Sequence, residues 1–451
     1  QSASIFCPVE FSSVSLLPWG VNIEPLEVKM KNQLLSRRQA LKLSAGTVAA
    51  TGLGLYAPAV ISSDPITLRY LGTAVSMGDE VQKKLFEDTG LKVKFIAVTT
   101  DEVTKRVLTQ PNSFDIVDTE YFSLPKLVPS GNILGMDTKR IKEWDNVTSI
   151  FTKGITPKGK KVGLQGTAPS KVMYLEGSTG KSFAGDVTQY ATLIPTIYNA
   201  DTLGIRPDLI GRPITSWAEL LNPEFKGKAA TLNIPSIGIM DAAMVVEAMG
   251  EYKYPDKGNM TKSEIDLTMK IFTEAKKSGQ FRAFWTDFNE SVNLMASGEV
   301  VIQSMWSPAI TAVKSQGKDC IYQPLKEGYR AWAAGFALPK TTKGKKADAV
   351  YEFVNWYLSG WVGAYLNRQG YYSAVLPTAK QYMSEDEWGF WMEGKAAKGD
   401  IVSPTGAKLA SAGEKRDGGS YEDRMGGVAC WNATMDENKY MVRKWNEMVA
   451  A

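Results

Sequence analysis

Beyond Asp64 the chain alternates short apolar segments with amphipathic ones. Residues 67–71 and 92–98 place apolar side chains at alternate positions, as half-buried strands do, and residues 114–117 have the pattern of a buried strand. Between these segments, residues 79–88 and the stretch after Thr100 have a helical pattern of apolar positions. This β-α-β-α-β order predicts an α/β fold with a mostly parallel sheet covered by helices.

The middle of the chain predicts a second unit of the same kind. Ser216 followed by Glu219 has the spacing of a capping box at the start of a short helix. Apolar patterns predict further strands and helices, at residues 192–198, 228–232, 239–249, 300–306 and 347–358. Pro308 is expected to break the structure after one of these strands, and residues 394–427, rich in Gly, Ser, Lys and Asp, are expected to form a long surface loop or a lid.

Polar residues follow two of the predicted strands of the first unit. Gly72 and Thr73 come directly after the first strand, and residues 118–121 (Asp-Thr-Glu-Tyr) follow the third. Ligands of parallel α/β sheets bind beyond the carboxyl ends of the strands. Both segments are therefore candidate positions at the rim of a binding site.

The N-terminal part of the chain has the features of an export signal. Arg37 and Arg38 precede a weakly apolar run at residues 43–56, and Ala57-Pro58-Ala59 ends it with small residues. We expect residues 30–59 to be a signal peptide of the twin-arginine type, cleaved near Ala59, with the mature protein in the periplasm. The general secretory route stays open, because Ala40 stands where the twin-arginine signal usually has Phe.

Two further expectations concern this end of the chain. Residues 1–29 precede a plausible initiator, Met30, so they are expected to be an upstream extension outside the fold. A membrane anchor is the alternative to a signal peptide, but spanning a bilayer takes roughly 20 apolar residues and the run is shorter and mixed.

Composition narrows the chemistry that the chain can support. The 451 residues include no histidine, which excludes nucleophiles served by a His base and His-ligated metals. The 52 lysines and arginines nearly balance the 48 acids, so the charge does not indicate a nucleic-acid partner. No metal or cofactor is expected. Cys320 and Cys430 in an oxidising compartment could form a disulfide or remain free thiols.

An ordered set of motifs resembles periplasmic solute-binding proteins of ABC transporters, and the spermidine/putrescine-binding group in particular. The motifs that carry the resemblance span nearly all of the chain after the leader, at residues 72–73, 114–121, 215–220, 223–228, 296–300 with 305–306, and 335–339. The resemblance implies a protein without catalytic activity that works as a monomer. Its partners would be a small-molecule solute and the inner-membrane ABC permease with its ATPase.

The resemblance also implies a two-lobe periplasmic-binding-protein fold of type II. Each lobe would be a mostly parallel sheet flanked by helices, with the ligand in a cleft that closes by a hinge. Residues 64–190 with 333–376 would form lobe 1, and residues 191–332 with 377–451 would form lobe 2. The chain would cross between the lobes near residues 190–196, near Trp332 and near residues 371–377.

The positions that match the family's cleft include many aromatic residues. Trp306 and Trp332 match its stacking tryptophans best, and aromatic faces attract ammonium groups. Packing in the core of a lobe is the alternative for each tryptophan, and it is favoured for Trp285. The ligand-binding residues expected from the resemblance are Thr73, Thr119, Glu120, Tyr121, Ser236, Trp285, Asp287, Trp306, Trp332, Tyr371 and Tyr372.

The chain lacks acids at positions where polyamine-binding members of the family have them. Ala334 stands where polyamine-binding members of the family carry an aspartate, and residues 235–238 are apolar or Ser where they carry acids. Glu120 or Asp287 could substitute, or could be surface acids. Ser236 at a predicted helix start suits a carboxylate or phosphate oxygen, or is an ordinary cap. The expected solute is therefore a small amine, either a polyamine or a related amine with an acid group.

Two other functions stay open at this point. The neighbouring Tyr371 and Tyr372 resemble the phenolate pairs of ferric-ion-binding proteins, since hard Fe(III) favours oxygen ligands. An exported hydrolase is the other alternative. Without histidine it would need a pair of carboxylates or a Ser/Lys dyad, and no Ser-x-x-Lys motif lies at a helix start with a partner motif.

Overall fold

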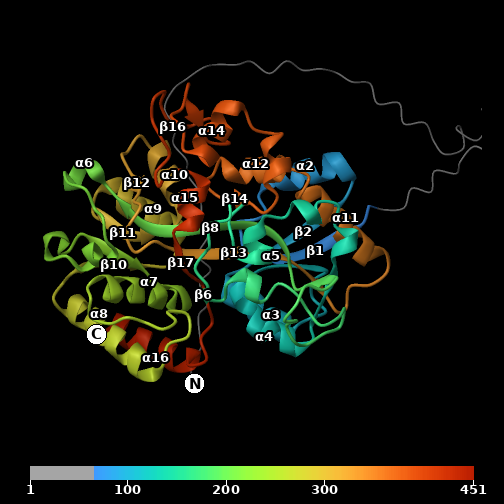
Figure 1. The fold of residues 1–451 in the computed structure, drawn as a ribbon, viewed down its shortest axis with the longest axis horizontal. Helices are drawn as coiled ribbons and strands as arrows, with labels where there is room; N and C mark the ends of the chain where they lie inside the picture. The colour runs from blue at the N-terminus through green and yellow to red at the C-terminus, as the bar shows by residue number, and fades with distance from the viewer. Residues whose placement is uncertain (1–64) are drawn as a thin grey trace, which may run out of the picture. The chain divides into compact units, whose positions relative to one another are not determined.

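Two long antiparallel strands, β8 (Ile194–Ile205) and β13 (Tyr329–Pro339), form the centre of the fold. The structure is a computed structural model that describes residues 65–451 (Figure 1). The predicted upstream extension, signal peptide and cleavage point near Ala59 lie outside the described residues. The two strands belong to a sheet in the order β10-β9-β11-β8-β13-β3-β1-β2, so each half of the molecule contributes one side of a shared sheet.

The first lobe lies on the β13 side of the sheet. Its strands β1 (Thr67–Gly72), β2 (Lys92–Ala97) and β3 (Ile116–Glu120) are parallel to one another, and β3 pairs antiparallel with β13. Its helices are α2 (Asp79–Thr89), α3 (Thr100–Thr109), α4 (Leu124–Ser130) and α11 (Lys345–Tyr357). The strands and helices predicted for the start of the chain are confirmed, with ends that differ by a few residues.

The second lobe lies on the β8 side. Strands β9 (Ala229–Leu232), β10 (Phe281–Trp285) and β11 (Ile302–Met305) are parallel, and β11 pairs antiparallel with β8. Its helices form two groups, α7 (Pro235–Ala248), α8 (Lys262–Lys277) and α16 (Asn438–Ala450) in one, and α9 (Phe288–Ser297) and α10 (Ser307–Ser315) in the other. Strand β11 ends before Pro308, as expected of a strand breaker, and Pro308 is the second residue of α10, where a missing N–H costs nothing.

The remaining elements are short. The helices among them are α5 (Ser149–Lys153), α6 (Pro207–Ile210), α12 (Trp361–Asn367), α13 (Leu376–Lys380), α14 (Glu385–Glu393) and α15 (Tyr421–Gly426). The strands are β4 (Ile133–Leu134), β5 (Met136–Asp137), β6 (Gln165–Gly166), β7 (Tyr190–Ala191), β12 (Ile321–Tyr322), β14 (Tyr372–Ser373), β15 (Ile401–Val402), β16 (Lys408–Ala410) and β17 (Val428–Trp431). Short 3₁₀ turns connect several of them, at Tyr121–Ser123, Thr138–Arg140, Trp144–Asn146, Pro169–Lys171, Trp217–Leu221 and Pro223–Phe225.

The C-terminal part of the chain is more regular than its composition predicts. Residues 394–427 include the β15–β16 hairpin and helix α15, which Ser420 caps by accepting a hydrogen bond from Asp423 N. Strand β17 then lies between β13 and β6, parallel to both. The expected long loop is therefore only partly a loop, because local caps and strand pairing give it structure that Gly and Ser content does not reveal.

Buried side chains gather in three hydrophobic clusters. One fills the first lobe, and the other two contain helices of the two groups in the second lobe. Side chains of residues 390–431 contribute mainly to the first cluster, whereas Trp445 of α16 belongs to the second. The lobe boundaries expected from the sequence stay a prediction. They place all of residues 377–451 in lobe 2, whereas the buried side chains of these residues divide between two clusters.

Helix α8 is fixed at its start by a capping box that was not predicted from the sequence. The Thr261 hydroxyl accepts from Glu264 N, and the Glu264 carboxylate accepts from Thr261 N. We expect Thr261→Ala to lower the free energy of unfolding by about 1 kcal/mol, because a helix N–H loses its acceptor. Thr273→Ala in the middle of the same helix is the control, and equal losses in urea unfolding of both variants would contradict the cap.

Candidate functional site

The carboxyl end of strand β3 carries the polar residues of the first lobe's rim. Thr119 is 3% exposed, and its hydroxyl has no hydrogen-bond partner among residues 65–451. The partly exposed Glu120 accepts hydrogen bonds from Thr100 Oγ1 at 3.1 Å and from Asn432 Nδ2 at 3.3 Å. Thr73 follows β1, the neighbouring strand, and is also partly exposed. This edge of the sheet therefore has one partly exposed carboxyl group, that of Glu120, whereas the buried Thr119 before it in β3 points to the opposite face of the sheet.

Burial changes the protonation of the acids at this edge. It raises the pKa of Glu120 to about 7, although hydrogen bonds from Asn432 and Thr100 act in the opposite direction. Burial also raises the pKa of Asp118, two residues earlier in β3, to about 6. Near neutral pH, Glu120 is thus close to its midpoint, and a cation placed beside it would favour its ionised form.

In the second lobe, the start of helix α7 and the ends of two strands supply the corresponding residues. Ser236 is the second residue of the 14-residue helix α7, and its hydroxyl has no partner within the described part of the chain. Trp285 ends β10 and Trp306 follows β11, with ring centroids 5.0 Å apart in an edge-to-face arrangement. Trp285 is fully buried and Trp306 is partly exposed, so the first supports the second from behind.

Aromatic residues of the crossing segments form the third group. Trp332 lies in β13 and packs edge-to-face on Tyr371, with ring centroids 5.8 Å apart. Ala334, which is on the same face of β13 as Trp332, pairs with Glu120 in β3. Trp332 and Glu120 are therefore diagonal neighbours on one face of the sheet. Ser307 donates a hydrogen bond to the carbonyl of Gly370. Because Trp306 precedes Ser307 and Tyr371 follows Gly370, this bond places Trp306 and Tyr371 in the same region.

The two adjacent tyrosines do not form a pair of metal-binding phenols. The Tyr371 ring packs on Trp332, whereas the hydroxyl of the fully buried Tyr372 accepts a hydrogen bond from Arg416 Nη1 at 2.7 Å. Neighbouring residues of an extended segment point to opposite sides, which separates the two hydroxyls. The ferric-ion alternative requires two neighbouring phenol oxygens that can bind one metal, and Tyr371 and Tyr372 do not provide them.

Other predicted site residues have structural roles. Tyr121 is 1% exposed and packs on Phe151 in the core of the first lobe. Asp287 is exposed, and its carboxylate accepts from Asn289 N and Glu290 N, so it caps helix α9. The structure thus brings together Glu120, Trp332 and Tyr371, and it gives Tyr121 and Asp287 other partners. Their roles in ligand binding stay predictions.

A buried ionic network beneath this region was not recognised in the sequence. Arg330 of β13 contacts Asp241 of α7 (Nε to Oδ1, 2.6 Å) and Asp201 of β8 (Nη2 to Oδ2, 3.5 Å), and all three side chains are at most 1% exposed. Arg330 Nη1 also donates to Asn432 Oδ1 at 2.9 Å. Asn432 therefore joins the network to Glu120 at the rim. The sequence does contain a signal for this network, since Asp201 and Arg330 are charged residues within strands whose other residues are mostly apolar.

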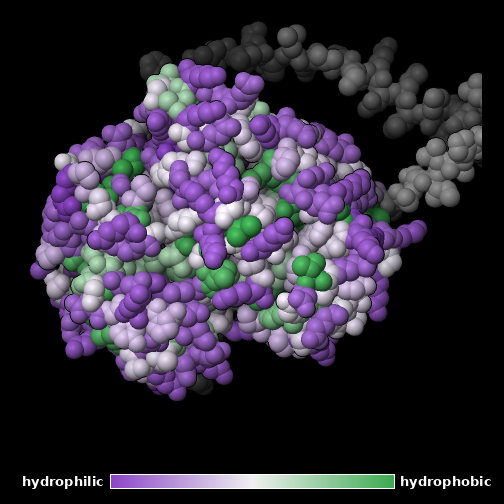
Figure 2. All heavy atoms as spheres, viewed as in Figure 1, coloured by the Kyte–Doolittle hydropathy of each residue, from purple (hydrophilic) through white to green (hydrophobic). Residues whose placement is uncertain are grey.

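A second connection between the lobes lies beside this network. Gly166 N of β6 donates to Asp256 Oδ1 at 2.8 Å, and Lys257 Nζ donates to Gln165 Oε1 at 3.3 Å. Figure 2 shows a largely hydrophilic surface on this view of the molecule, with a notch at its lower edge between the half carrying α8 and α16 and the half carrying α3 and α4. Polar contacts therefore also connect the lobes away from the crossing strands.

The cysteines are free in the structure. Cys320 and Cys430 are both buried, and they belong to different hydrophobic clusters of the second lobe. Burial raises the pKa of each thiol to about 12, so neither is a reactive thiolate at neutral pH. Of the helices within residues 65–451, none is long and apolar enough to cross a membrane.

Comparison with known proteins gives a consistent result. Residues 80–388 match the sequence model of the bacterial extracellular solute-binding proteins. The spermidine/putrescine-binding periplasmic proteins of Escherichia coli (strain K12) and Salmonella typhimurium (strain LT2) are each 23% identical to the chain over 322 residues, which cover 70% of this chain and 80% of the relative.

Solved structures share the fold at lower identity. The spermidine/putrescine ABC transporter substrate-binding protein of Streptococcus pneumoniae aligns with a TM-score of 0.57 and 14% identity, covering 85% of this chain and 98% of its own. The agropinic acid complex of AgtB from A. tumefaciens R10 aligns with a TM-score of 0.52 and 16% identity, covering 86% and 99%. The predicted two-lobe α/β fold of type II is confirmed by these likenesses.

Proposed function

Since the chain belongs to the family of bacterial extracellular solute-binding proteins, we propose that it captures a small solute carrying both an amine and an acid group. Proteins of this family are the solute-binding components of ABC importers and work with a membrane permease and its ATPase, and they are not enzymes. Export through residues 30–59 and function as a monomer in the periplasm belong to the same proposal.

The single observation that carries the amine is the position of Glu120 beside Trp332. Ammonium groups bind over aromatic faces and need a carboxylate when they leave water. Glu120 is partly exposed, while the other acids of the network, Asp201 and Asp241, are occupied by Arg330. One accessible carboxyl group suits one ammonium group better than the two or more of a polyamine.

The start of helix α7 supports the acid group. Its N-terminus carries partial positive charge and the N–H group of Ser236, whereas Pro235 has no N–H and the N–H groups of residues 237 and 238 donate to the carbonyl of residue 234. The Ser236 side chain adds a buried hydroxyl that is unpartnered among residues 65–451. No acidic residue occupies the first turn of this helix. An oxyanion bound here would meet donors and no repelling carboxylate from that turn.

A polyamine is the second candidate solute. It is favoured by the curated relatives, whose names describe spermidine/putrescine binding. Ala334 opposes it, because this position pairs with Glu120 at the rim and offers no second carboxylate for a second ammonium group.

Calorimetric titration of the purified protein with putrescine, spermidine and ω-amino acids of matching length separates the two candidates. We expect an ω-amino acid to bind more tightly than the diamine of the same length. Tighter binding of putrescine or spermidine would contradict the amino-acid proposal and support the polyamine. A thermal shift gives a second readout, since ligand at a hundred times Kd adds about 2.7 kcal/mol of stability.

Replacing Trp332 by alanine tests the aromatic wall. We expect Kd for the bound amine to rise by roughly 30-fold or more, because a buried aromatic contact of this kind is typically worth about 2 kcal/mol. Trp388→Ala is the matched control, since Trp388 is a partly buried tryptophan on α14 that packs at the edge of the first lobe's core. Equal loss of affinity in both variants would assign the effect to the fold.

The affinity for an amine should also depend on pH through Glu120. Below about 7, the pKa that burial gives this group, the carboxyl is protonated and offers the ammonium no charge. Affinity should therefore rise as pH increases from 6 to 8 and then level off. Glu120→Gln should flatten most of this rise. An unchanged pH profile in that variant would remove Glu120 from the site.

A further inference from the structure

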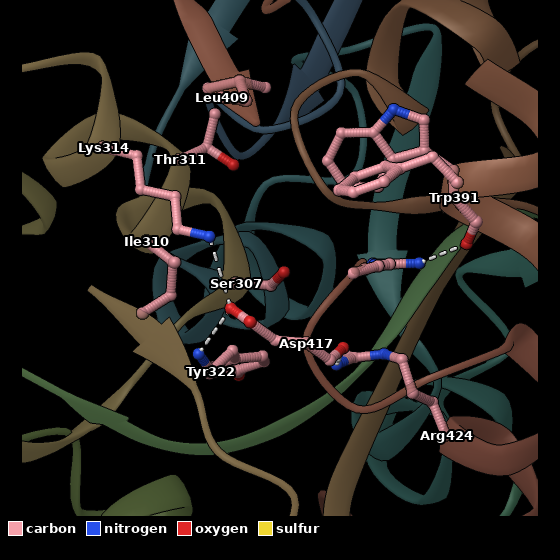
Figure 3. Close-up of a pocket in the computed structure, with 11 residues that line it drawn as sticks. Ser307, Ile310, Thr311, Lys314, Tyr322, Trp391, Leu409, Asp417 and Arg424 are labelled. Carbon is pink, nitrogen blue, oxygen red and sulfur yellow. Dashed lines mark hydrogen bonds and ion pairs between the residues drawn. The ribbon is translucent and has the colours of Figure 1, made fainter. Parts of the chain in front are cut away.

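A small cavity lies beside the crossing segment that carries Tyr371 and Tyr372. It has a volume of about 40 Å³ and is bounded by helix α10, helix α14, strand β16 and the segment that leads to α15 (Figure 3). The residues that line it are Ser307, Ile310, Thr311, Lys314, Tyr322, Phe390, Trp391, Leu409, Arg416, Asp417 and Arg424. Since one water needs roughly 10 to 15 Å³, the cavity accepts a few waters or one small ion.

Arg416 is buried in the wall of this cavity without a carboxylate partner. Its Nη1 donates to Tyr372 Oη and to the Trp391 carbonyl, both at 2.7 Å, and its guanidinium carbon lies 4.8 Å from the centres of both rings. Its remaining hydrogen bond goes to the Gly370 carbonyl at 3.3 Å. Every partner of this cation is neutral, although the residue is only 7% exposed.

Arg424 is a second buried cation in the same wall. It donates to the carbonyls of Ala200 at 3.0 Å and Asp417 at 3.3 Å, and its Nε has no partner within the part of the chain that the structure describes. The residue is 1% exposed. No carboxylate of residues 65–451 forms an ion pair with Arg416 or Arg424.

The acid in the lining of the cavity is already held by other groups. The Asp417 carboxylate accepts from Tyr322 N at 2.9 Å and lies 3.5 Å from Lys314 Nζ, and Figure 3 shows both groups directed at it. Three cationic side chains thus line the cavity with one carboxylate. A buried charge without a close counter-ion is costly, and burial lowers the pKa of Arg416 to about 10, although Tyr372 and the charge of Asp417 act in the opposite direction.

We propose that this cavity binds a small monovalent inorganic anion, with chloride as the probe. The guanidinium groups of Arg416 and Arg424 would supply the charge, and the N-terminal turn of α10, which contributes Ser307 and Ile310 to the lining, adds a favourable dipole. Neither Glu120 nor Trp332 lines this cavity, so it is a different site from the proposed amine site, although Gly370 and Tyr372, which contact Arg416, lie on either side of Tyr371 in the chain.

Thermal unfolding of the purified protein in sodium chloride and in sodium gluconate at equal ionic strength tests the proposal. Gluconate is too large for the cavity, so only chloride should give a rise in Tm that saturates with concentration. Arg416→Gln should lose this chloride-dependent rise, since Gln can still donate to the Trp391 carbonyl but carries no charge. Arg443→Gln, at an exposed position on α16, is the matched control and should keep it.

A crystal soaked in sodium bromide gives a readout that does not depend on a variant. We expect an anomalous peak between the guanidinium groups of Arg416 and Arg424. If Arg416→Gln does not fold, Lys314→Gln is the second variant and should weaken the chloride effect. Equal Tm curves in chloride and gluconate, a chloride effect that persists in Arg416→Gln, or the absence of a bromide peak in the cavity would each overturn the proposal.

Discussion

Replacing Arg330 by methionine should lower the free energy of unfolding by about 3–5 kcal/mol at neutral pH. Arg330 is the shared cation of Asp201 and Asp241, and all three side chains are at most 1% exposed. Methionine fills much of the volume but leaves both carboxyl groups buried without a counter-charge. The result is measured by urea unfolding, from the shift of the midpoint at a constant slope.

The pH dependence of this variant distinguishes lost charge from lost packing. Burial raises the pKa of Asp201 to about 6 even though the Arg330 charge lowers it, so removing Arg330 raises it further. This carboxyl is neutral in acid and becomes a buried charge as pH rises. The stability lost by Arg330→Met should therefore be smaller at pH 5 than at pH 8.

Two further variants serve as controls for Arg330→Met. Arg282→Met removes an arginine from an exposed pair with Glu299 and should change stability by less than about 1 kcal/mol. Adding Asp241→Asn to Arg330→Met removes one of the stranded charges and should recover part of the loss. A loss in Arg330→Met that is the same at pH 5 and pH 8 would show that packing, and not charge, dominates.

Replacing Trp445 by alanine is the second change for which we expect a large effect. Trp445 of α16 is fully buried in the second lobe, its Nε1 donates to Asn233 Oδ1 at 2.8 Å, and its ring fills the space beside Gly238 of α7. Removing a buried tryptophan costs about 3–5 kcal/mol. Because Asn233 and Gly238 flank the start of α7, the variant should also weaken binding at Ser236.

Trp445→Phe separates the two contributions of this side chain. It keeps most of the ring and loses the hydrogen bond, so its loss of stability should be clearly smaller. Trp388→Ala is again the control for an alanine at a less buried tryptophan. If Trp445→Ala and Trp388→Ala unfold at the same urea concentration, the docking of α16 contributes little to the stability of the second lobe.

The sequence was most informative where one residue pattern repeats along an element. The alternating apolar positions of residues 67–71 and 92–98 predicted β1 and β2, and Gly90 ends α2 with a φ of 73° as expected of a helix-terminating glycine. Helix α7 begins at Pro235, four residues before the predicted start, because proline suits the first position of a helix. The start was not predicted because α7 has apolar residues on all sides, which hides the helical period of the sequence.

The site was less predictable because it depends on pairs of residues far apart in the chain. Asp201 and Arg330 are separated by 129 positions yet lie opposite one another in the register of β8 and β13. Nothing local to either residue indicates the other. The same holds for Asn432 and Glu120, which meet only because β17 pairs with β13. Trp306 and Trp332 could be named early because the resemblance supplied their positions.

The position of β17 has a consequence for how the protein acquires its structure. Residues 428–431 pair with β6 and β13, so the sheet of the first lobe is completed by strands whose sequence positions span most of the chain. A chain emerging from the ribosome cannot form these pairings until almost all of it has been synthesised. Contacts this distant in sequence slow folding. We therefore expect a truncation before Val428 to leave a long-lived, incompletely folded species, and not an independently folded first lobe.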